Sequence, residues 1–254
     1  ALQDGRVHAE SGGVEEEPST FGSVLRADYT FARFVVGESN QRAYELARLY
    51  PATPQLYILH SAEYQIELPP QVPGTVAALV AMNERTARRA AASALDAEIV
   101  RLRQPIDFLR FRPRRGPGGS PPTAVLLGNT LQGPRRRLLL GALDDAGIAW
   151  RQPGAAGAGI TLAPDQELAD ADIVIGYGRS VLEGMSAGCA PYVYDLGLDG
   201  WVTPESYPAI EADGFAGTAT DGVATRERLA ADLAAYDPAL GVAARELLIT
   251  HHSP

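Results

Sequence analysis

The segment at residues 171–195, ADIVIGYGRSVLEGMSAGCAPYVYD, constrains the fold of this chain more than any other. A short apolar run leads into Gly176-Tyr177-Gly178-Arg179-Ser180, a helical spacing of apolar residues continues to Gly188, and a second apolar run ends at Asp195. This order of strand, glycine turn, helix and strand is typical of a parallel α/β sheet. The turn exposes backbone N–H groups at a helix N-terminus, where the helix dipole favours negative charge, and it therefore predicts a phosphate site.

Composition limits the classes of function. With 254 residues, 46% of them hydrophobic, the chain can form one large domain or two small ones. The net charge of −9 argues against broad binding to nucleic acids or anionic membrane surfaces. All 22 basic residues are arginine, which we interpret as the mark of a GC-rich bacterial genome. Cys189 is the single cysteine, so an internal disulfide and a cysteine-based zinc site are excluded.

Strands and helices alternate along the chain, which predicts mainly parallel sheets with right-handed crossovers. The apolar runs are no longer than strands, so we predict no membrane span and a cytoplasmic protein. We expect a loop at residues 196–201. Strands are predicted at residues 31–36, 55–59, 76–82, 99–102, 124–127, 148–151, 173–175 and 192–194, and helices at 40–50, 83–97, 135–147, 165–170, 181–187, 203–211, 225–236 and 239–249.

Two changes of composition divide the chain. Residues 1–20 are rich in Gly, Glu and Ser without periodicity and predict a flexible tail. A stretch dense in Pro, Gly and Arg ends at residue 122; we interpret it as an interdomain linker, with a surface loop inside one domain as the alternative. The predicted domains are an N-terminal α/β unit at 21–112 and a C-terminal α/β unit at 123–254, joined by the linker at 113–122. Ligands of such sheets bind at the carboxyl ends of the strands, so a site in the cleft between the units is expected.

The text Leu-Glu-Gly-Met-Ser-Ala-Gly-x-x-Pro from Leu182 resembles the nucleotide-sugar-binding half of GT-B glycosyltransferases, especially the family-4-like group, where it reads close to LEAMACGxPV. Further likenesses are VLLGN at 125–129 with the arginines after it, LVAMNERTARRA at 79–90, Asp107 in RQPIDFLRFRP, and His60 at a strand end. The resemblance covers about residues 30 to 250 in the expected order. It implies two Rossmann-like units facing a cleft, with a shortened N-terminal unit.

The resemblance assigns the C-terminal unit to the donor. Gly178, Arg179 and Ser180 would hold a diphosphate through backbone N–H groups and a bidentate guanidinium, the alternative being an ordinary strand-to-helix turn. Glu183 is expected in the first helical turn, and the resemblance assigns it the nucleotide ribose. The alternative is a glutamate that only satisfies the helix dipole.

A second group of residues is expected around the leaving group and the sugar. Arg135 and Arg136 would supply positive charge for the leaving diphosphate, or would simply be a solvated helix start. Asp195, Asp199 and Gly200 follow the next strand, where the resemblance implies contacts with the transferred sugar. A plain loop is the alternative for these three.

Catalytic candidates lie in the N-terminal unit. His60 ends a strand and can bind a substrate hydroxyl or take a proton, unless it is a structural histidine. Glu63 follows as a candidate base, or as a surface acid. Ile175 replaces the first glutamate of the usual pair in the resembling group, and no lysine is present for its basic pair.

The sequence therefore predicts a metal-independent glycosyltransferase that moves a sugar from a nucleoside diphosphate sugar to an unknown acceptor, with no further cofactor. Helix N-termini and arginines would neutralise the leaving diphosphate. The alternatives are a non-catalytic nucleotide-sugar-binding module, such as a degenerate transferase subunit, and a nucleotide-sugar isomerase. Val181 stands where a dinucleotide-binding fingerprint needs its third glycine, which argues against a dehydrogenase. Association as a homodimer or partner subunit stays open.

Overall fold

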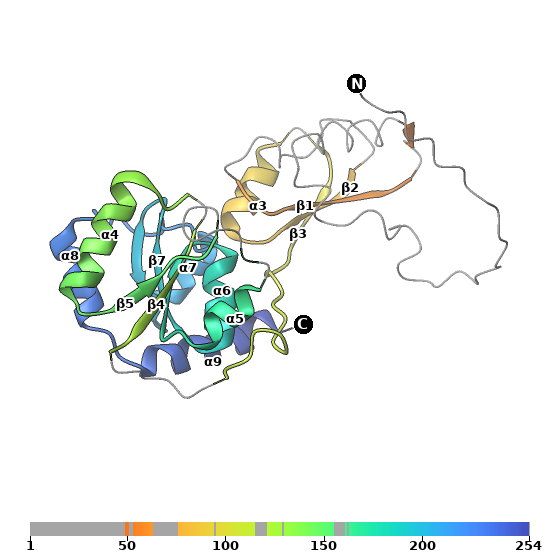
Figure 1. Ribbon diagram of the computed structural model, residues 1–254. Coiled ribbons are helices and arrows are strands. Elements are labelled where there is room, and N and C mark those ends of the chain that lie inside the picture. The colour runs from red at the N-terminus through yellow and green to blue at the C-terminus, as the bar shows by residue number, and fades with distance from the viewer. Residues whose placement is uncertain are drawn as a thin grey trace, which may run out of the picture.

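A computed structural model describes residues 49–50, 53–62, 76–93, 95–114, 121–128, 130–154, 161 and 163–253. The predicted tail at 1–20, the strand at 31–36, all but the last two residues of the helix at 40–50, and Glu63 lie outside these residues. Two sheets lie side by side, joined by the segment between β3 and β4 (Figure 1). The prediction of an α/β fold with two parallel-sheet units is confirmed.

The N-terminal sheet has the strand order β1-β2-β3, and both pairings are parallel. Asn83 begins the helix after β2 through a capping box, in which its side chain accepts from the Thr86 N–H and the Thr86 hydroxyl accepts from the Asn83 N–H. The elements of this unit are β1 (Gln55–Leu59), β2 (Val76–Ala81), α3 (Glu84–Ala91) and β3 (Glu98–Arg101).

The C-terminal sheet has the order β5-β4-β6-β7-β8, in which only the last pairing is antiparallel. Its strands are β4 (Thr123–Leu127), β5 (Ala149–Arg151), β6 (Ile173–Gly176), β7 (Ala190–Tyr194) and β8 (Leu198–Trp201). Its helices are α4 (Gly133–Asp145), α5 (Pro164–Ala169), α6 (Arg179–Ala187), α7 (Tyr207–Ala212), α8 (Arg226–Ala234) and α9 (Ala239–His252).

Helices cover both faces of the C-terminal sheet, and alternate residues of each strand enter different cores. In β4, Val125 and Leu127 face the core that includes residues of α6 and α9, whereas Ala124 and Leu126 face the core under α4 and α8. Figure 1 shows these two helical layers on opposite sides of the strands. A strand that is apolar on both faces fits this buried position, as the continuous apolar runs indicated.

Several expected elements differ from the structure. The helix predicted at 83–97 ends already at Ala91, six residues early. The loop predicted at 196–201 is wrong, because β8 returns beside β7 after a tight turn and Tyr192 pairs with Trp201. Their rings meet edge to face with centroids 4.9 Å apart, and the Trp201 indole donates to the carbonyl of Asp232. The helix predicted from residue 203 begins only at Tyr207, after a turn. Two glycines in the β8 segment hide its alternation from sequence analysis.

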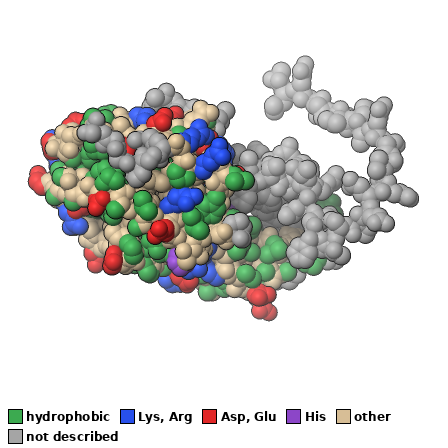
Figure 2. All heavy atoms as spheres, turned by 90° about the horizontal axis from the view of Figure 1, so that it is seen from below, with side chains coloured by type: hydrophobic (Ala, Val, Ile, Leu, Met, Phe, Trp, Pro, Cys, Tyr) green, Lys and Arg blue, Asp and Glu red, His purple; other side chains and the backbone are tan. Residues whose placement is uncertain are grey.

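The segment between the sheets packs on the C-terminal unit before the predicted linker begins. Ile106 and Phe111 are buried in the core that includes residues of α6 and α9. Of the predicted linker at 113–122, residues 115–120 lie outside the described part of the chain. On the face seen in Figure 2, arginine side chains gather in separate patches with acidic and apolar side chains between them.

Candidate functional site

The carboxyl ends of β4, β6 and β7 meet at one edge of the C-terminal sheet, where the chain continues as Gly128, Tyr177 and Asp195. Helix α4 begins shortly after β4, and α6 begins shortly after β6. Because β4 and β6 are paired neighbours in the sheet, the two helices that follow them begin next to each other at this edge. Ligands of open α/β sheets bind at such an edge, so this is the place to examine.

The N-terminus of α6 is open to a ligand. Gly178 occupies the cap position with φ 58° and ψ −132°, a conformation that favours glycine, and its N–H donates to the carbonyl of Phe215 at 2.8 Å. No side chain caps α6, and its first turn contains no acidic residue. The backbone N–H groups around Arg179 and Ser180 therefore belong to a helix start whose first turn contains no residue of negative charge.

Glu183 lies one turn later than the sequence indicated. Because α6 begins at Arg179, Glu183 is in the second turn, and the expected first-turn position is wrong. Its carboxylate accepts from Arg179 Nε at 2.8 Å in an i,i+4 pair. The Arg179 side chain is 54% exposed, whereas that of Glu183 is 13% exposed. The pair thus presents a guanidinium to solvent and holds the carboxylate beneath it.

Arg135 and Asp195 form the second part of the site. Arg135 Nη1 donates to the Asp195 carbonyl at 2.7 Å and lies 3.7 Å from its Oδ1. The buried Asp195 side chain also accepts from the Thr130 hydroxyl at 2.6 Å. A Cβ on Gly128 would lie 2.7 Å from Asp195 Oδ2, so a larger residue at position 128 would have to displace the Asp195 carboxylate. Burial raises the pKa of Asp195, and the Thr130 hydrogen bond and Arg135 oppose that rise.

Arg136 contacts other residues than Arg135 does. Its Nε donates to Gln152 Oε1 at 2.6 Å, and its guanidinium lies 5.6 Å from the centre of the Trp150 ring. Gln152 is buried and also donates to the carbonyl of Leu131. The two arginines predicted to act together are thus held by different partners, one beside β7 and one beside β5. Helix α4 itself has no side-chain cap and no acid in its first turn.

Asp199 and Gly200 lie on β8 rather than in a loop. The Asp199 carboxylate accepts from the N–H of Thr220 at 2.8 Å and from its hydroxyl at 3.1 Å. Gly200 pairs with Val193, one residue back from the end of β7. Of the three residues expected to meet the transferred sugar, the structure brings Asp195 to Arg135 and ties Asp199 to Thr220.

His60 brings the N-terminal sheet to this edge. It follows β1, and burial together with the nearby Arg179 guanidinium lowers the pKa of His60 to about 4. The ring is therefore neutral at pH 7. Elsewhere on the junction, a Cβ on Gly214 would collide with the Asn83 side chain. The carboxyl ends of the two sheets thus face each other, as the resemblance implied.

Sequence analysis missed two contributors. The Thr130 hydroxyl holds Asp195, and the polar turn directly after β4 was the available signal. Arg85 Nη1 donates to Asp213 at 3.2 Å and to the Thr218 hydroxyl at 2.9 Å, across the junction. No pattern in the sequence links Arg85 to residues so far along the chain, because only the docking of the two units brings them together.

Two further findings concern the described residues only. Among them, no group of three or more His, Cys, Asp or Glu side chains is arranged to hold a metal ion. No helix in that part of the chain combines the length and apolar character that crossing a membrane requires.

No protein-family model matches the sequence, and no curated protein matches it. The crystal structure of Anabaena Alr3699/HepE in complex with UDP and glucose aligns with a TM-score of 0.51 and 11% identity, over 86% of this chain and 72% of that chain. A glycosyltransferase from Rickettsia africae ESF-5 aligns at 0.48 and 12%, over 94% and 80%. The glycotransferase of kitacinnamycin aligns at 0.38 and 16%, over 85% and 58%. Of these three, the Anabaena structure alone exceeds 0.5, and at its low identity the likeness shows a shared fold.

Proposed function

We propose that this protein is a GT-B-type, family-4-like glycosyltransferase that moves a sugar from a nucleoside diphosphate sugar to an acceptor. The observation that carries the proposal is the pair of helix N-termini at the carboxyl ends of β4 and β6. Both lack a capping side chain and an acid in the first turn, and each has an arginine there, Arg135 in α4 and Arg179 in α6. Two such termini suit two linked phosphate groups.

The likeness in fold to a protein crystallised with UDP and glucose supports the same class of donor. In this proposal Arg135 and Arg179 bind the diphosphate, with backbone N–H groups around Gly178 and Ser180. Negative charge grows on the diphosphate as the glycosidic bond breaks, and donors already in place stabilise it without reorganising. The reaction would then need no metal ion.

The remaining residues have supporting roles in the proposal. Glu183 accepts hydroxyl groups of the ribose, while Arg179 turns from it towards phosphate. Asp195 holds Arg135 through two of its oxygens and places it for the donor. His60, neutral at pH 7, accepts a hydrogen bond from a sugar or acceptor hydroxyl. Glu63 remains a proposed base.

The proposal also gives roles to residues around the transferred sugar, to Arg136 and to the N-terminal unit. Asp199 and Gly200 shape the hairpin after Asp195, which would border the transferred sugar. Arg136, which is bound to Gln152, would add positive charge near the start of α4 for the leaving diphosphate. The acceptor is assigned to the N-terminal unit.

The test is binding of UDP, GDP, ADP and dTDP by isothermal titration calorimetry, with and without magnesium, on the full chain. Arg179→Gln should weaken the preferred diphosphate by about tenfold or more, since it removes a charge-assisted contact. Arg228→Gln is a matched control, because Arg228 and Asp232 form the same kind of i,i+4 pair on α8. Equal losses in both variants, or no binding of any diphosphate, would contradict the donor site.

A second measurement separates an enzyme from a binding module. The nucleotide sugar of the diphosphate that binds is incubated with the protein, and release of the diphosphate is followed. Release that stops in Arg179→Gln but continues in Arg228→Gln supports transfer to water or to an acceptor. Binding without any release, over acceptors of several classes, would favour the non-catalytic module instead.

A further inference from the structure

A pocket of about 490 Å³ lies at the junction of the two units, away from the helix N-termini of the proposed donor site. Its walls come from α3, the end of β3, the segment that leaves β3, α7, and the last turn of α9. A volume of this size suits a monosaccharide-sized ligand. The lining residues are Glu84, Arg101, Leu102, Arg103, Pro105, Glu211, His251, His252 and Ser253.

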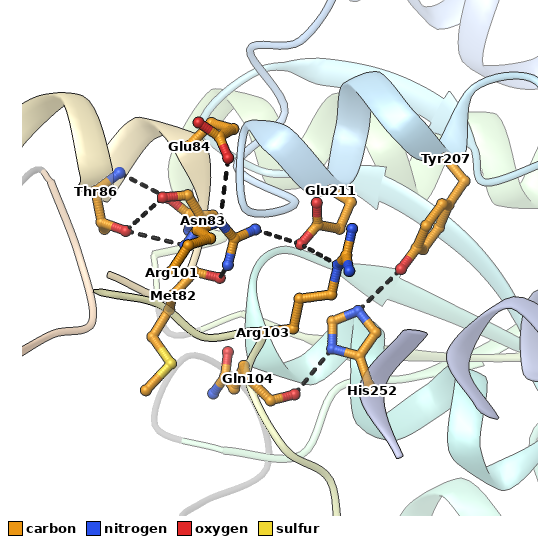
Figure 3. A network of polar contacts seen from close by, with 10 residues as sticks. All are labelled: Met82, Asn83, Glu84, Thr86, Arg101, Arg103, Gln104, Tyr207, Glu211 and His252. Atoms are coloured by element: carbon orange, nitrogen blue, oxygen red, sulfur yellow. Dashed lines mark hydrogen bonds and ion pairs between the residues drawn. The ribbon is translucent and has the colours of Figure 1, made fainter. Parts of the chain in front are cut away.

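Arg101 links several walls of the pocket, and all of its guanidinium nitrogens have contacts. Its Nη2 contacts Glu211 Oε1 at 2.6 Å, its Nε contacts Glu84 Oε1 at 3.3 Å, and its Nη1 donates to the carbonyl of Met82 (Figure 3). Every nitrogen of this guanidinium therefore has a partner. The Glu211 side chain is 8% exposed, so this pair ties α7 of one unit to β3 of the other.

Arg103 is engaged on one side only. Its Nε lies 3.3 Å from the same Glu211 oxygen, and its side chain is 46% exposed (Figure 3). Within the described part of the chain, its two terminal nitrogens have no hydrogen-bond partner. A guanidinium anchored through Nε leaves its Nη1 and Nη2 edge available for a carboxylate or phosphate.

The two histidines at the end of α9 have different roles. His252 is closed on both sides: Nδ1 donates to the Gln104 carbonyl at 2.9 Å, and Nε2 accepts from the Tyr207 hydroxyl at 3.0 Å. Burial lowers the pKa of His252, which agrees with this neutral form. His251 stacks on the Tyr207 ring with centroids 5.1 Å apart and lines the pocket. Its imidazole is thus fixed in orientation at the pocket wall.

The charges of the lining residues indicate which class of ligand the pocket can bind. Arg101 and Arg103 are matched by Glu84 and Glu211, so the lining does not favour a polyanion. We propose that this pocket is a second ligand site, which takes a small hydroxylated oxyanion such as a sugar acid or a sugar monophosphate. The oxyanion binds the free edge of Arg103 and the imidazole of His251. The ligand's hydroxyl groups donate to the carboxylates of Glu84 and Glu211.

This site does not depend on the proposed transferase activity, because its residues are separate from those at the starts of α4 and α6. Its walls come from both units, so a bound ligand bridges them. Binding should therefore raise the melting temperature of the whole chain by mass action.

The test is calorimetry on the full chain at constant ionic strength with glucuronate, glucose 6-phosphate and glucose. We expect at least one of the two oxyanions to bind about tenfold or more tightly than glucose, because glucose lacks the group for Arg103. The two oxyanions distinguish a carboxylate site from a phosphate site. Arg103→Gln should remove that preference, and His251→Asn should reduce it.

Arg112→Gln is the control, since Arg112 is an exposed arginine in the same segment that does not line the pocket. Arg103→Gln leaves the contact between Arg101 and Glu211 intact, so its fold can be checked by an unchanged melting temperature without ligand. Arg179→Gln should keep oxyanion binding, and Arg103→Gln should keep nucleoside diphosphate binding. Three results would overturn the inference: no oxyanion binding at millimolar concentration, equal affinity for glucose, or affinity unchanged in Arg103→Gln.

Discussion

The two sheets are both parallel in their main pairings, yet they are buried to very different extents. Every residue of β6 and β7 is buried. In the N-terminal sheet, by contrast, Leu56 is 70% exposed, and no residue of β3 is buried. The described core of the N-terminal sheet consists of Leu59, Val76, Leu79 and Ala90, whereas two large clusters pack against the C-terminal sheet.

This difference in burial indicates how each unit positions its residues at the candidate site. The C-terminal unit places its glycine turns and arginines on a sheet packed on both faces, so their geometry follows from its own core. The N-terminal unit depends on polar contacts across the junction, among them Arg101 with Glu211 and Arg85 with Asp213. These contacts lie at the same junction as His60, whose pKa the Arg179 guanidinium lowers.

The largest expected effect compares the two cores directly. Leu126 and Leu79 are both fully buried, in a large cluster and in the small one. We expect Leu126→Ala to lower the free energy of unfolding by about 3–5 kcal/mol. We expect Leu79→Ala to lower it by only about 2–3 kcal/mol, because its neighbours on the adjoining strands, Tyr57 and Ile99, are partly exposed and can relax into the cavity. Urea denaturation measures both. An equal or larger loss for Leu79→Ala would contradict the conclusion that the N-terminal sheet has the less tightly packed core.

The next effect concerns the junction. Arg101→Met leaves the nearly buried Glu211 with only the longer contact to Arg103, and we expect a loss of about 2–4 kcal/mol. Arg226→Met is the control, because Arg226 pairs with the exposed Asp145 within the C-terminal unit. That variant should lose much less. Similar losses would mean that the junction adds little to stability, which urea denaturation of both variants will reveal.

A smaller effect should appear in the pH dependence of stability. The folded pKa of His60, about 4, lies below its value of 6.5 in the unfolded chain. Its contribution is therefore complete above pH 6.5 and is lost as the pH falls towards 4, since the unfolded chain takes up the proton first. Between pH 7 and pH 5, His60→Gln should lose less stability than the unmodified protein. Parallel pH profiles would show that His60 is not buried against Arg179.

The smallest effect separates binding from stability. Arg179→Gln and Arg228→Gln each remove one i,i+4 ion pair whose arginine is exposed to solvent, and each should cost only about 0.3–0.5 kcal/mol. Thermal unfolding of both variants checks this. A far larger loss for Arg179→Gln would mean that Arg179 holds the two units together. Weaker diphosphate binding by this variant would then partly reflect its loss of stability.

Much of the fold could be predicted from local pattern. The alternation and length of apolar runs located the strands at 55–59 and 124–127 correctly, and the helix predicted from residue 83 begins directly after Asn83. Strand β8 could not be predicted, because Gly197 and Gly200 interrupt its alternation and its position comes from pairing with β7. For the same reason, the sequence predicted a phosphate site at the glycine turn but could not predict the contacts that the structure shows around it.

The sequence by itself determined the α/β class, the order of the strands and helices before β8, and the glycine turn at Gly178, because spacing and backbone sterics act over a few residues. Only the tertiary structure decided that Arg135 meets Asp195 while Arg136 meets Gln152, since these contacts join strands that are distant in the chain. The pocket at Arg103 depends on the docking of two units, and no local pattern encodes which side chains that docking brings together.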